Sequence, residues 1–349
     1  MNESDADKPA RRLRYQGSHP RSFGEKYKEH QPDRYADDVA KVVASGKTPA
    51  GTHRPVMLRE ILSVLAPQPG ELAIDCTLGY GGHARELLTA IQPGGRLLGL
   101  DVDPVELPKT ESRLGELGYP PDCLIARRSN YAGLARIAAE VFPDGADLIL
   151  ADLGLSSMQL DDPQRGFTFK NDAPLDMRMN PQHGQSAASL LTKLDESKLA
   201  KLLVENADEP RANRLARAIL QAQTREPIRT TQALADVIRA ALAATDCSVD
   251  DTNVTIRRVF QALRIAVNDE FGALDALLRQ IPQCLRSGGR VAILTFHSGE
   301  DRRVKRAFKT GLAEGIYASI ADEVVRPSPE EQRENPRSSS AKLRYATRH

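Results

Sequence analysis

Three glycines follow an acidic residue in the segment Leu72–Glu86. An apolar run ends there at Asp75, and Gly79, Gly81 and Gly82 precede a stretch with helical spacing. Glycine lets the backbone turn tightly and lets a ligand approach where a Cβ would obstruct it. Backbone amides at the start of a helix also suit a polar or anionic group. The segment therefore predicts a loop that binds a nucleotide-type cofactor.

The spacing of this loop fits two classes of cofactor. Gly79-x-Gly81-x-x-Ala84 matches the dinucleotide fingerprint, and Asp101 lies about 20 residues further on, where a ribose-binding acid is expected. A carboxylate at that point can accept hydrogen bonds from both ribose hydroxyls of NAD or of S-adenosylmethionine (SAM). The loop alone leaves open a nicotinamide dehydrogenase, a SAM-dependent methyltransferase and an ordinary strand–turn–helix.

Three further features favour SAM. Asp75 lies at the junction of strand and loop, where a carboxylate can organise the loop around a sulfonium or an amino-acid group. Asp152 directly follows a later apolar strand and is expected at the same edge of the sheet. The loop also holds one glycine more than a pyrophosphate turn needs, and the bulky His83 stands where the helix begins.

The elements that must position these residues alternate between apolar strands and helical patterns. Strands are predicted at residues 72–74, 96–100, 123–126, 147–151 and 290–296. Three of these strands end in an acid or a polar turn, and helical segments connect them. Such alternation indicates a parallel sheet, in which ligands lie beyond the carboxyl ends of the strands.

The alternation is interrupted in the middle of the chain, where residues 158–252 contain helical and loop patterns but no convincing strand. We therefore expect an α/β, doubly wound Rossmann-like domain made of residues 51–157 and 253–349. Residues 158–252 would be an all-helical insert that recognises the substrate. Residues 1–50 are polar and partly basic, and are predicted to be a flexible extension, either a solvated tail or an arm for RNA phosphates.

Composition limits the partners, metals and cellular location that can be expected. The chain has 349 residues and a formal net charge of +1, which by itself predicts no partner. Its four cysteines lie far apart without a CxxC pair, which argues against a zinc site or a disulfide framework, and no metal is expected. Neither a signal core nor an apolar run of about 18 residues is present. We expect a cytoplasmic protein with no membrane partner.

A series of motifs resembles the ribosomal RNA small subunit methyltransferase H (MraW-like) family. The first motifs in the series are His53–Leu58, Asp75–His83 and Asp101–Asp103. The middle of the chain contributes Asp152–Ser157, Gln159–Asp161, Arg165–Phe169 and Pro174–Met179. The remainder contributes Phe260–Ile265, Gly288–Arg290, Phe296–Ser298 and Asn335–Arg344. The resemblance extends from about residue 53 to the C-terminus.

This resemblance implies a class I SAM methyltransferase sheet and methyl transfer to the exocyclic N4 amine of a decoding-region cytidine in small-subunit (16S) rRNA. The partner would be that RNA or the 30S subunit, and the oligomeric state stays open. By motif alignment, the cofactor-binding positions are Gly81, Gly82, His83, Asp101, Tyr131, Asp152 and Gln159. Tyr131 would line the adenine. Asp152 is also the candidate for orienting the amine, although many amine methyltransferases have Asp/Asn-Pro-Pro-Tyr/Phe where this chain has Asp-Leu-Gly-Leu.

One loop carries four candidates for RNA contact. Arg165, Phe167 and Phe169 could hold an extruded cytosine by stacking, or the phenylalanines could anchor the loop on the core. Arg178 could contact RNA or donate to a structural ion pair.

The other RNA candidates lie later in the chain. Arg257 and Arg264 share a helix face that could track phosphates or be solvated. His297 follows the last predicted strand and could touch the target base or be a structural histidine. Basic runs at Asp301–Arg306 and at Arg337–Arg344 suit an RNA backbone or water equally well.

Two motifs depart from the family pattern. A Gly-Glu-Glu motif appears as Ala207-Asp-Glu209, and His-Ser-Leu-Glu-Asp appears as His297-Ser-Gly-Glu-Asp301. We match no family segment to the N-terminal 50 residues. These departures keep open a catalytically altered RNA-binding assembly factor on the same scaffold, beside the methyltransferase and a nicotinamide-dependent oxidoreductase.

Overall fold

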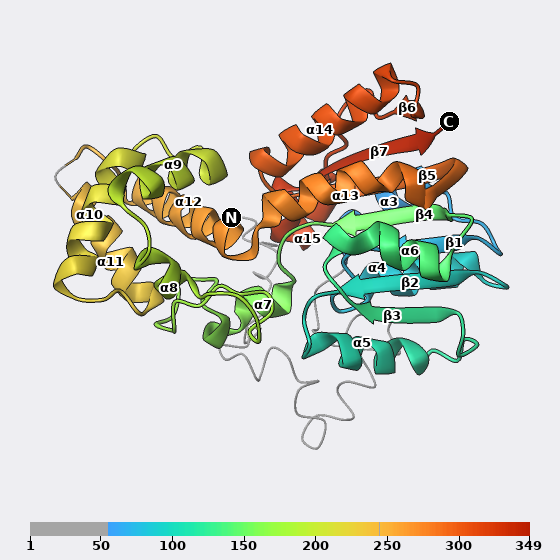
Figure 1. The fold of residues 1–349 in the computed structure, drawn as a ribbon, viewed down its shortest axis with the longest axis horizontal. Coiled ribbons are helices and arrows are strands. Elements are labelled where there is room, and N and C mark those ends of the chain that lie inside the picture. The colour runs from blue at the N-terminus through green and yellow to red at the C-terminus, as the bar shows by residue number, and fades with distance from the viewer. Residues whose placement is uncertain (1–54, 244) are drawn as a thin grey trace, which may run out of the picture. The chain divides into compact units, whose positions relative to one another are not determined.

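A seven-stranded sheet organises the part of the chain that the computed structural model describes, residues 55–243 and 245–349. Its strand order is β3-β2-β1-β4-β5-β7-β6 (Figure 1). The strands are β1 (Leu72–Asp75), β2 (Arg96–Asp101), β3 (Leu124–Arg128), β4 (Ala146–Asp152), β5 (Leu285–Thr295), β6 (Tyr317–Ile320) and β7 (Lys342–Arg348). The first five are parallel, and β7 pairs antiparallel with both β5 and β6.

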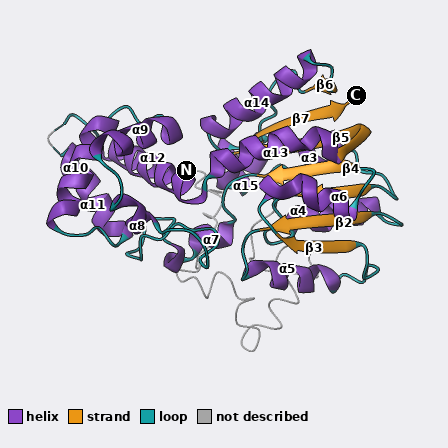
Figure 2. Cartoon of the chain, in the orientation of Figure 1, coloured by secondary structure: helices purple, strands orange, loops and turns teal. Residues whose placement is uncertain are grey.

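Burial on both faces explains why the central strands are apolar runs. Successive side chains of a strand point to opposite faces, so helices must cover both. One face packs against α6 (Leu134–Val141), α13 (Glu270–Cys284) and α14 (Ser298–Ala313). The other packs against α3 (Leu58–Leu65), α4 (Gly82–Ile91) and α5 (Glu106–Gly115). The predicted doubly wound α/β class is confirmed, and Figure 2 shows the helices flanking the strands.

The five predicted strands are present with small differences at their ends. β5 begins earlier than expected, and Ser287–Gly289 lies where its pairing with β4 shifts register. β6 and β7 were not predicted. In β7 the sequence Lys342–Arg348 mixes charged and apolar residues, because an antiparallel strand near an edge does not require an unbroken apolar run.

Helices fill the segment between β4 and β5, where the described residues form only an isolated bridge, Pro174 to Thr230. They are α7 (Ser157–Asp161), α8 (Ala187–Leu191), α9 (Glu196–Ala207), α10 (Ala212–Arg225), α11 (Thr231–Leu242) and α12 (Val249–Asn268). Their apolar faces form a core of their own. The predicted helical insertion is therefore present, and the boundary expected at residues 252–253 falls inside α12.

Short elements complete the described chain, which belongs to one compact unit, residues 52–349. They are the 3₁₀ turns η2 (Tyr131–Gly133), η3 (Pro163–Arg165) and η4 (Pro336–Ser340) and the helix α15 (Pro329–Glu334). Among the described residues, none of the helices has the length and apolar character needed to cross a bilayer. The flexible extension predicted for residues 1–50 lies outside the described residues.

Candidate active site

Thr77 connects the carboxyl ends of β1 and β4. Its backbone amide donates to Oδ1 of Asp75 at 3.0 Å, and its hydroxyl accepts the amide of Asp152 at 2.7 Å. Burial raises the pKa of Asp75 to about 7, and the nearby charge of Asp101 acts in the same direction. The two acids expected at this edge of the sheet are thus held beside each other by one threonine.

The glycine loop is bound to the end of β2 and to α5. The amide of Gly79 donates to Oδ2 of Asp101 at 2.7 Å, and its carbonyl accepts the hydroxyl of Thr110 at 2.6 Å. Gly81 has a φ of 83°, and a Cβ there would lie 2.9 Å from Cγ2 of Thr110. A Cβ on Gly82 would lie 2.8 Å from Cγ of Pro55. The loop therefore packs so closely against Thr110 and Pro55 that a side chain at Gly81 or Gly82 would clash.

Asp101 shapes the loop with both of its oxygens. Oδ2 takes the Gly79 amide, and Oδ1 accepts the amide of Asp103 at 2.8 Å. Burial raises the pKa of Asp101, an effect that these two hydrogen bonds oppose. Each carboxylate oxygen has a further lone pair that can accept a hydroxyl hydrogen. The residue is therefore built into the loop and remains able to bind a ribose.

Asp103 links the cofactor loop to the start of the helical segment. Its Oδ2 accepts from Nε2 of Gln159 at 3.1 Å and from Nη1 of Arg165 at 2.9 Å. Although burial opposes them, these donors hold the pKa of Asp103 below its usual range. The Oε1 atom of Gln159 accepts the amide of Ser156, which closes the capping box of α7. Gln159 thus lies at the predicted site, with both ends of its amide already hydrogen-bonded.

His83 and Asp152 face each other at the mouth of the loop. Nε2 of His83 lies 3.0 Å from the carbonyl of Val56, and a carbonyl can only accept, so Nε2 carries the hydrogen. Nδ1 then presents its lone pair to Oδ2 of Asp152 at 3.6 Å. Burial lowers the pKa of His83 to about 4, so the imidazole is neutral at pH 7.

The Asp152 carboxyl is the most perturbed acid of this edge. Burial raises its pKa to about 8, and the charges of Asp75 and Glu300 add to that effect. Its Oδ1 atom is buried and accepts no hydrogen bond from any described residue. An unsatisfied buried carboxyl oxygen indicates an acceptor for a ligand that binds there.

A second group of polar and charged side chains lies near the end of β5. Its members are Tyr131, Arg264, Glu270, His297 and Glu300. Arg264 donates to both carboxylate oxygens of Glu270 at 2.8 and 2.9 Å. His297 Nε2 lies 3.2 Å from Oε1 of Glu300, whose Oε2 accepts the amide that precedes His297. Burial raises the pKa of Tyr131, and the charges of Glu270 and Glu300 raise it further. Possible metal-ligand atoms of Glu270, Glu300 and His297 lie within 4.8 Å of one another. Arg264 already neutralises Glu270, which makes this group a poor site for a cation.

The 165–179 loop candidates are all engaged within the protein. Arg165 pairs with Asp103 and also donates to the carbonyl of Met179 at 2.6 Å. Phe167 is 7% exposed in the helical core, and Phe169 packs edge-on against Phe260 with ring centroids 5.4 Å apart. These contacts match the structural alternative, in which the loop is anchored on the core.

The arginine candidates do not form one surface. Arg178 is held by Asp176 through two hydrogen bonds of 2.8 and 2.7 Å, and Arg264 is committed to Glu270. Arg257 is exposed on α12. Although Arg257 and Arg264 share a helix face by spacing, only Arg257 of the two is exposed and able to contact RNA.

The two departures from the family pattern meet at one junction. Asp208, which ends α9 with a φ of 50°, accepts from the hydroxyl of Ser298 at 3.0 Å and from Arg302 at 2.9 Å. A Cβ on the neighbouring Gly299 would lie 2.6 Å from Cζ of Phe271. The altered residues therefore join α9 to the start of α14 and do not alter the glycine loop.

Thr77, Glu270 and Glu300 are site residues that sequence reasoning missed. Glu300 stands three residues after the helix N-cap His297, which is the spacing of a capping box and was a usable signal. Thr77 had a weaker signal, since it only follows Asp75 by two residues. Glu270 had none, because its partner Arg264 becomes its neighbour only when the chain turns between α12 and α13.

Comparison with known proteins places this site in a family. A family model described as the MraW methylase family matches residues 50–349. "Ribosomal RNA small subunit methyltransferase H 1" of Lachnoclostridium phytofermentans is 47% identical over 339 residues, covering 96% of this chain and 92% of that protein. "Ribosomal RNA small subunit methyltransferase H 2" of Alkaliphilus metalliredigens is 47% identical over 347 residues, covering 99% of each. The second alignment takes in nearly all of residues 1–50, which corrects the expectation that this segment has no family counterpart.

The residues at the loop fit the cofactor of such an enzyme. Gly81 is the N-cap of α4, the carboxylate of Asp101 retains lone pairs for a ribose, and Oδ1 of Asp152 is an unused acceptor. The family match decides between the two cofactors that the loop left open. The chain belongs to the MraW methylase family and is a SAM-dependent methyltransferase.

Proposed function

We propose that this protein methylates the exocyclic N4 amine of a decoding-region cytidine in small-subunit ribosomal RNA, as free RNA or in the 30S subunit. Support comes from the names of relatives aligned over almost the whole chain, which are small-subunit ribosomal RNA methyltransferases. The observation that carries the chemistry is the buried Oδ1 atom of Asp152, which no described residue satisfies. It is an acceptor at the carboxyl edge of the sheet, where an amine would need one.

We assign the cofactor to the residues around the glycine loop. Gly81, Gly82 and His83 are proposed for the amino-acid end, because helix N-termini attract carboxylates. Asp101 is proposed for the ribose hydroxyls and Tyr131, which follows β3, for the adenine. Gln159 acts on the same loop by holding Asp103.

Residues 158–252 are proposed to recognise the RNA. Their helices have a core of their own, so the segment can present a surface without disturbing the sheet. Of the RNA candidates, Arg257 is exposed on α12, next to this segment.

In the mechanism, Asp152 prepares the amine as a nucleophile. When bound, SAM supplies an electrophilic methyl group. The cytosine amine is a weak nucleophile because its lone pair is delocalised into the ring. Oδ1 of Asp152 can accept an amine N–H, which favours a pyramidal nitrogen and stabilises the positive charge that develops there. Alignment of amine and methyl group can contribute about 7–11 kcal/mol.

His83 determines which oxygen of Asp152 serves the amine. Its Nδ1 lone pair faces Oδ2, so a protonated Asp152 carries its hydrogen on that side. Oδ1 then stays an acceptor in both protonation states. The ionised form also attracts the proton that the methylated amine must lose.

The test is transfer of labelled methyl from SAM to small subunits, or to their RNA, that lack the modification. Mass spectrometry should find the label as N4-methylcytidine at one decoding-region position. Label on a ring carbon would contradict the amine chemistry. RNA binding without any methylated cytidine would instead identify the assembly-factor alternative.

A further inference from the structure

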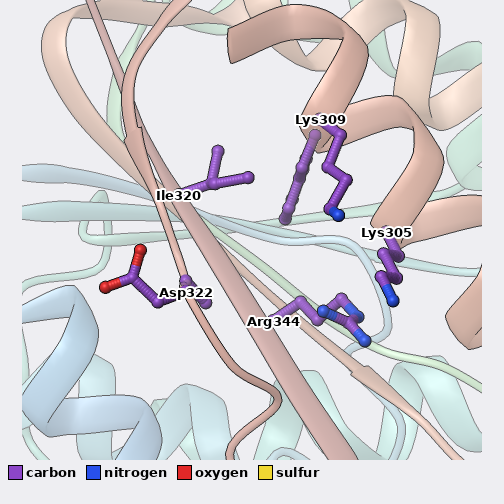
Figure 3. Close-up of a pocket in the computed structure, with 7 residues that line it drawn as sticks. Lys305, Lys309, Ile320, Asp322 and Arg344 are labelled. Carbon is purple, nitrogen blue, oxygen red and sulfur yellow. The ribbon is translucent and has the colours of Figure 1, made fainter.

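A shallow hollow lies between α14, β6 and β7 (Figure 3). Its charged lining consists of Lys305, Lys309, Arg344 and Asp322, and the apolar side chains of Phe308 and Ile320 contribute to the rest. Three cations against one carboxylate make this a positively charged site. None of these residues contacts Asp152 or the glycine loop in the described structure.

Lys305 and Lys309 lie one helical turn apart on α14, and their side chains share one face of the helix. Both are exposed, and neither ammonium forms an ion pair with a described residue. The same helix also carries Arg302 and Arg303, which are paired with Asp208 and Asp275. On this helix Arg302 and Arg303 are thus neutralised, whereas Lys305 and Lys309 are available.

Arg344 is held in a fixed orientation inside the hollow. It is 8% exposed, and its Nε donates to Oδ1 of Asp301 at 2.6 Å. Asp301 also accepts from Lys342 at 3.1 Å, so one carboxylate is shared by two cations. The terminal amino groups of Arg344 donate to no described residue and remain free for a ligand. A pre-oriented guanidinium beside two flexible ammonium groups suits a phosphate.

Asp322 does not neutralise this arrangement. Figure 3 shows its carboxylate on the opposite side of the hollow from Lys305 and Lys309. It forms no ion pair with a described cation. The two lysines therefore present positive charge that no described acid neutralises, beside an Arg344 that shares Asp301 with Lys342, although the whole chain carries a net charge of only +1.

The sheet register locates the hollow relative to the proposed methylation site. Asp152 pairs with Leu294, and Leu294 pairs with Leu343, so these three residues form one row across β4, β5 and β7. Neighbouring strands are about 4.8 Å apart, which puts Leu343 roughly 10 Å from Asp152 across the sheet. Arg344 follows Leu343 directly and pairs with Ile293, so its side chain points to the opposite face of the sheet, where α14 packs. A few nucleotides of single-stranded RNA can span such a distance.

We propose that the hollow formed by Lys305, Lys309 and Arg344 binds a backbone phosphate of the RNA strand that presents its base at Asp152. This inference rests on the proposed function, because it takes RNA as the substrate. Phosphate contacts of this kind position a strand without reading its sequence. They also release counterions, so binding must weaken with salt in proportion to the number of contacts.

The test compares the full-length parent with K305Q/K309Q. The probe is a single-stranded RNA with the decoding-region sequence, titrated over a range of salt concentrations. Loss of the phosphate contact should reduce the slope of log K against log [salt] by about 0.7 and weaken binding roughly 5-fold at about 0.1 M salt. The affinity for SAM should stay the same. K305R/K309R should keep the parent slope, because the positive charges remain.

R127Q/R136Q is the matched control, because it removes the same two charges from exposed positions on β3 and α6. Strand β3 forms the opposite edge of the sheet from β6 and β7. The control should bind RNA like the parent. An unchanged slope in K305Q/K309Q, or an equal loss in the control, would overturn the proposal. Loss of binding to phosphatidylserine vesicles with RNA affinity unchanged would also overturn it, in favour of a lipid surface.

These outcomes are independent of the methylation claim. If the parent methylates cytidine and K305Q/K309Q keeps its slope, the proposed function stands and the hollow is not a phosphate site. If the parent methylates no cytidine, the proposed function fails. A reduced slope in K305Q/K309Q would even then show RNA on the hollow.

Discussion

The Nδ1 atom of His83 lies 3.6 Å from Oδ2 of Asp152, and the other ring nitrogen is engaged by the carbonyl of Val56. The carbonyl determines the tautomer, so the imidazole can only offer a lone pair to the acid. Burial lowers the pKa of His83 to about 4 and raises that of Asp152 to about 8. Between these pH values both groups are neutral, and one oxygen of Asp152 remains unsatisfied.

Asp152→Asn should slow methyl transfer without loss of SAM. The amide is nearly isosteric, but it cannot ionise to stabilise the charge on the amine, and we expect kcat to fall about 10²- to 10³-fold. The dissociation constant of SAM should change less than about threefold, as calorimetry would show. Asp144→Asn, an exposed acid beyond the opposite end of β4, is the control. Equal losses of kcat and of SAM affinity would assign Asp152 to the cofactor.

Stability should fall as the pH rises from about 6.5 to 8. Asp152 and Asp75 have folded-state pKa values of about 8 and 7, above their unfolded values, so the folded state binds more protons in this range. Each such proton contributes about 1.4 kcal/mol per pH unit. His83 has the opposite sign, and its contribution ends near its unfolded pKa of about 6.5. Denaturant titrations of the parent and Asp152→Asn should show a shallower decline in the variant, and identical slopes would contradict the shifted pKa.

Asp101→Ala should weaken SAM binding far more than RNA binding. The change removes the proposed acceptor for ribose and frees the amides of Gly79 and Asp103. Hydrogen bonds to charged groups are worth about 1.5–3 kcal/mol, which predicts a loss of about 10- to 100-fold in SAM affinity. Asp122→Ala, an exposed acid before β3, should change neither affinity. Equal losses for SAM and RNA would show that the ribose role is wrong.

Gly82→Ala should damage the cofactor loop by steric crowding. Its Cβ would lie 2.8 Å from Pro55, so the loop or the proline must move. We expect about a 10-fold loss of SAM affinity, which corresponds to about 1.4 kcal/mol. Gly115→Ala is the matched control, because a Cβ at that helical position meets nothing within 4 Å. Normal SAM affinity in Gly82→Ala would mean that the loop is free to rearrange.

Phe167→Ala separates the two roles considered for that residue. Phe167 is buried in the helical core, so its truncation should lower the free energy of unfolding by about 3 kcal/mol. Denaturant unfolding measures this effect. An undiminished stability together with weaker RNA binding would instead support stacking on the target base.

Periodicity was enough to predict the strands that meet at the site. Helices cover both faces of β1, β2, β4 and β5. Because both faces are buried, successive residues of each strand are apolar and form an unbroken run. β7 escaped prediction, because it pairs with β5 and β6 and carries charged residues between its apolar ones. The acids at the strand ends could be predicted as well, because each directly follows an apolar run.

The sequence by itself determined the parallel sheet, the glycine loop and the acids Asp75, Asp101 and Asp152, because local spacing and strand burial are encoded along the chain. Only the tertiary structure decided which charged side chains are ion-paired within the protein and which can bind a ligand. Arg165 forms an ion pair with Asp103, and Arg264 forms one with Glu270. Lys305 and Lys309 instead line the hollow, and neither has an acidic partner among the described residues. The physical reason is that an ion pair depends on distances of a few ångströms between residues far apart in sequence, and these distances exist only once the chain has folded.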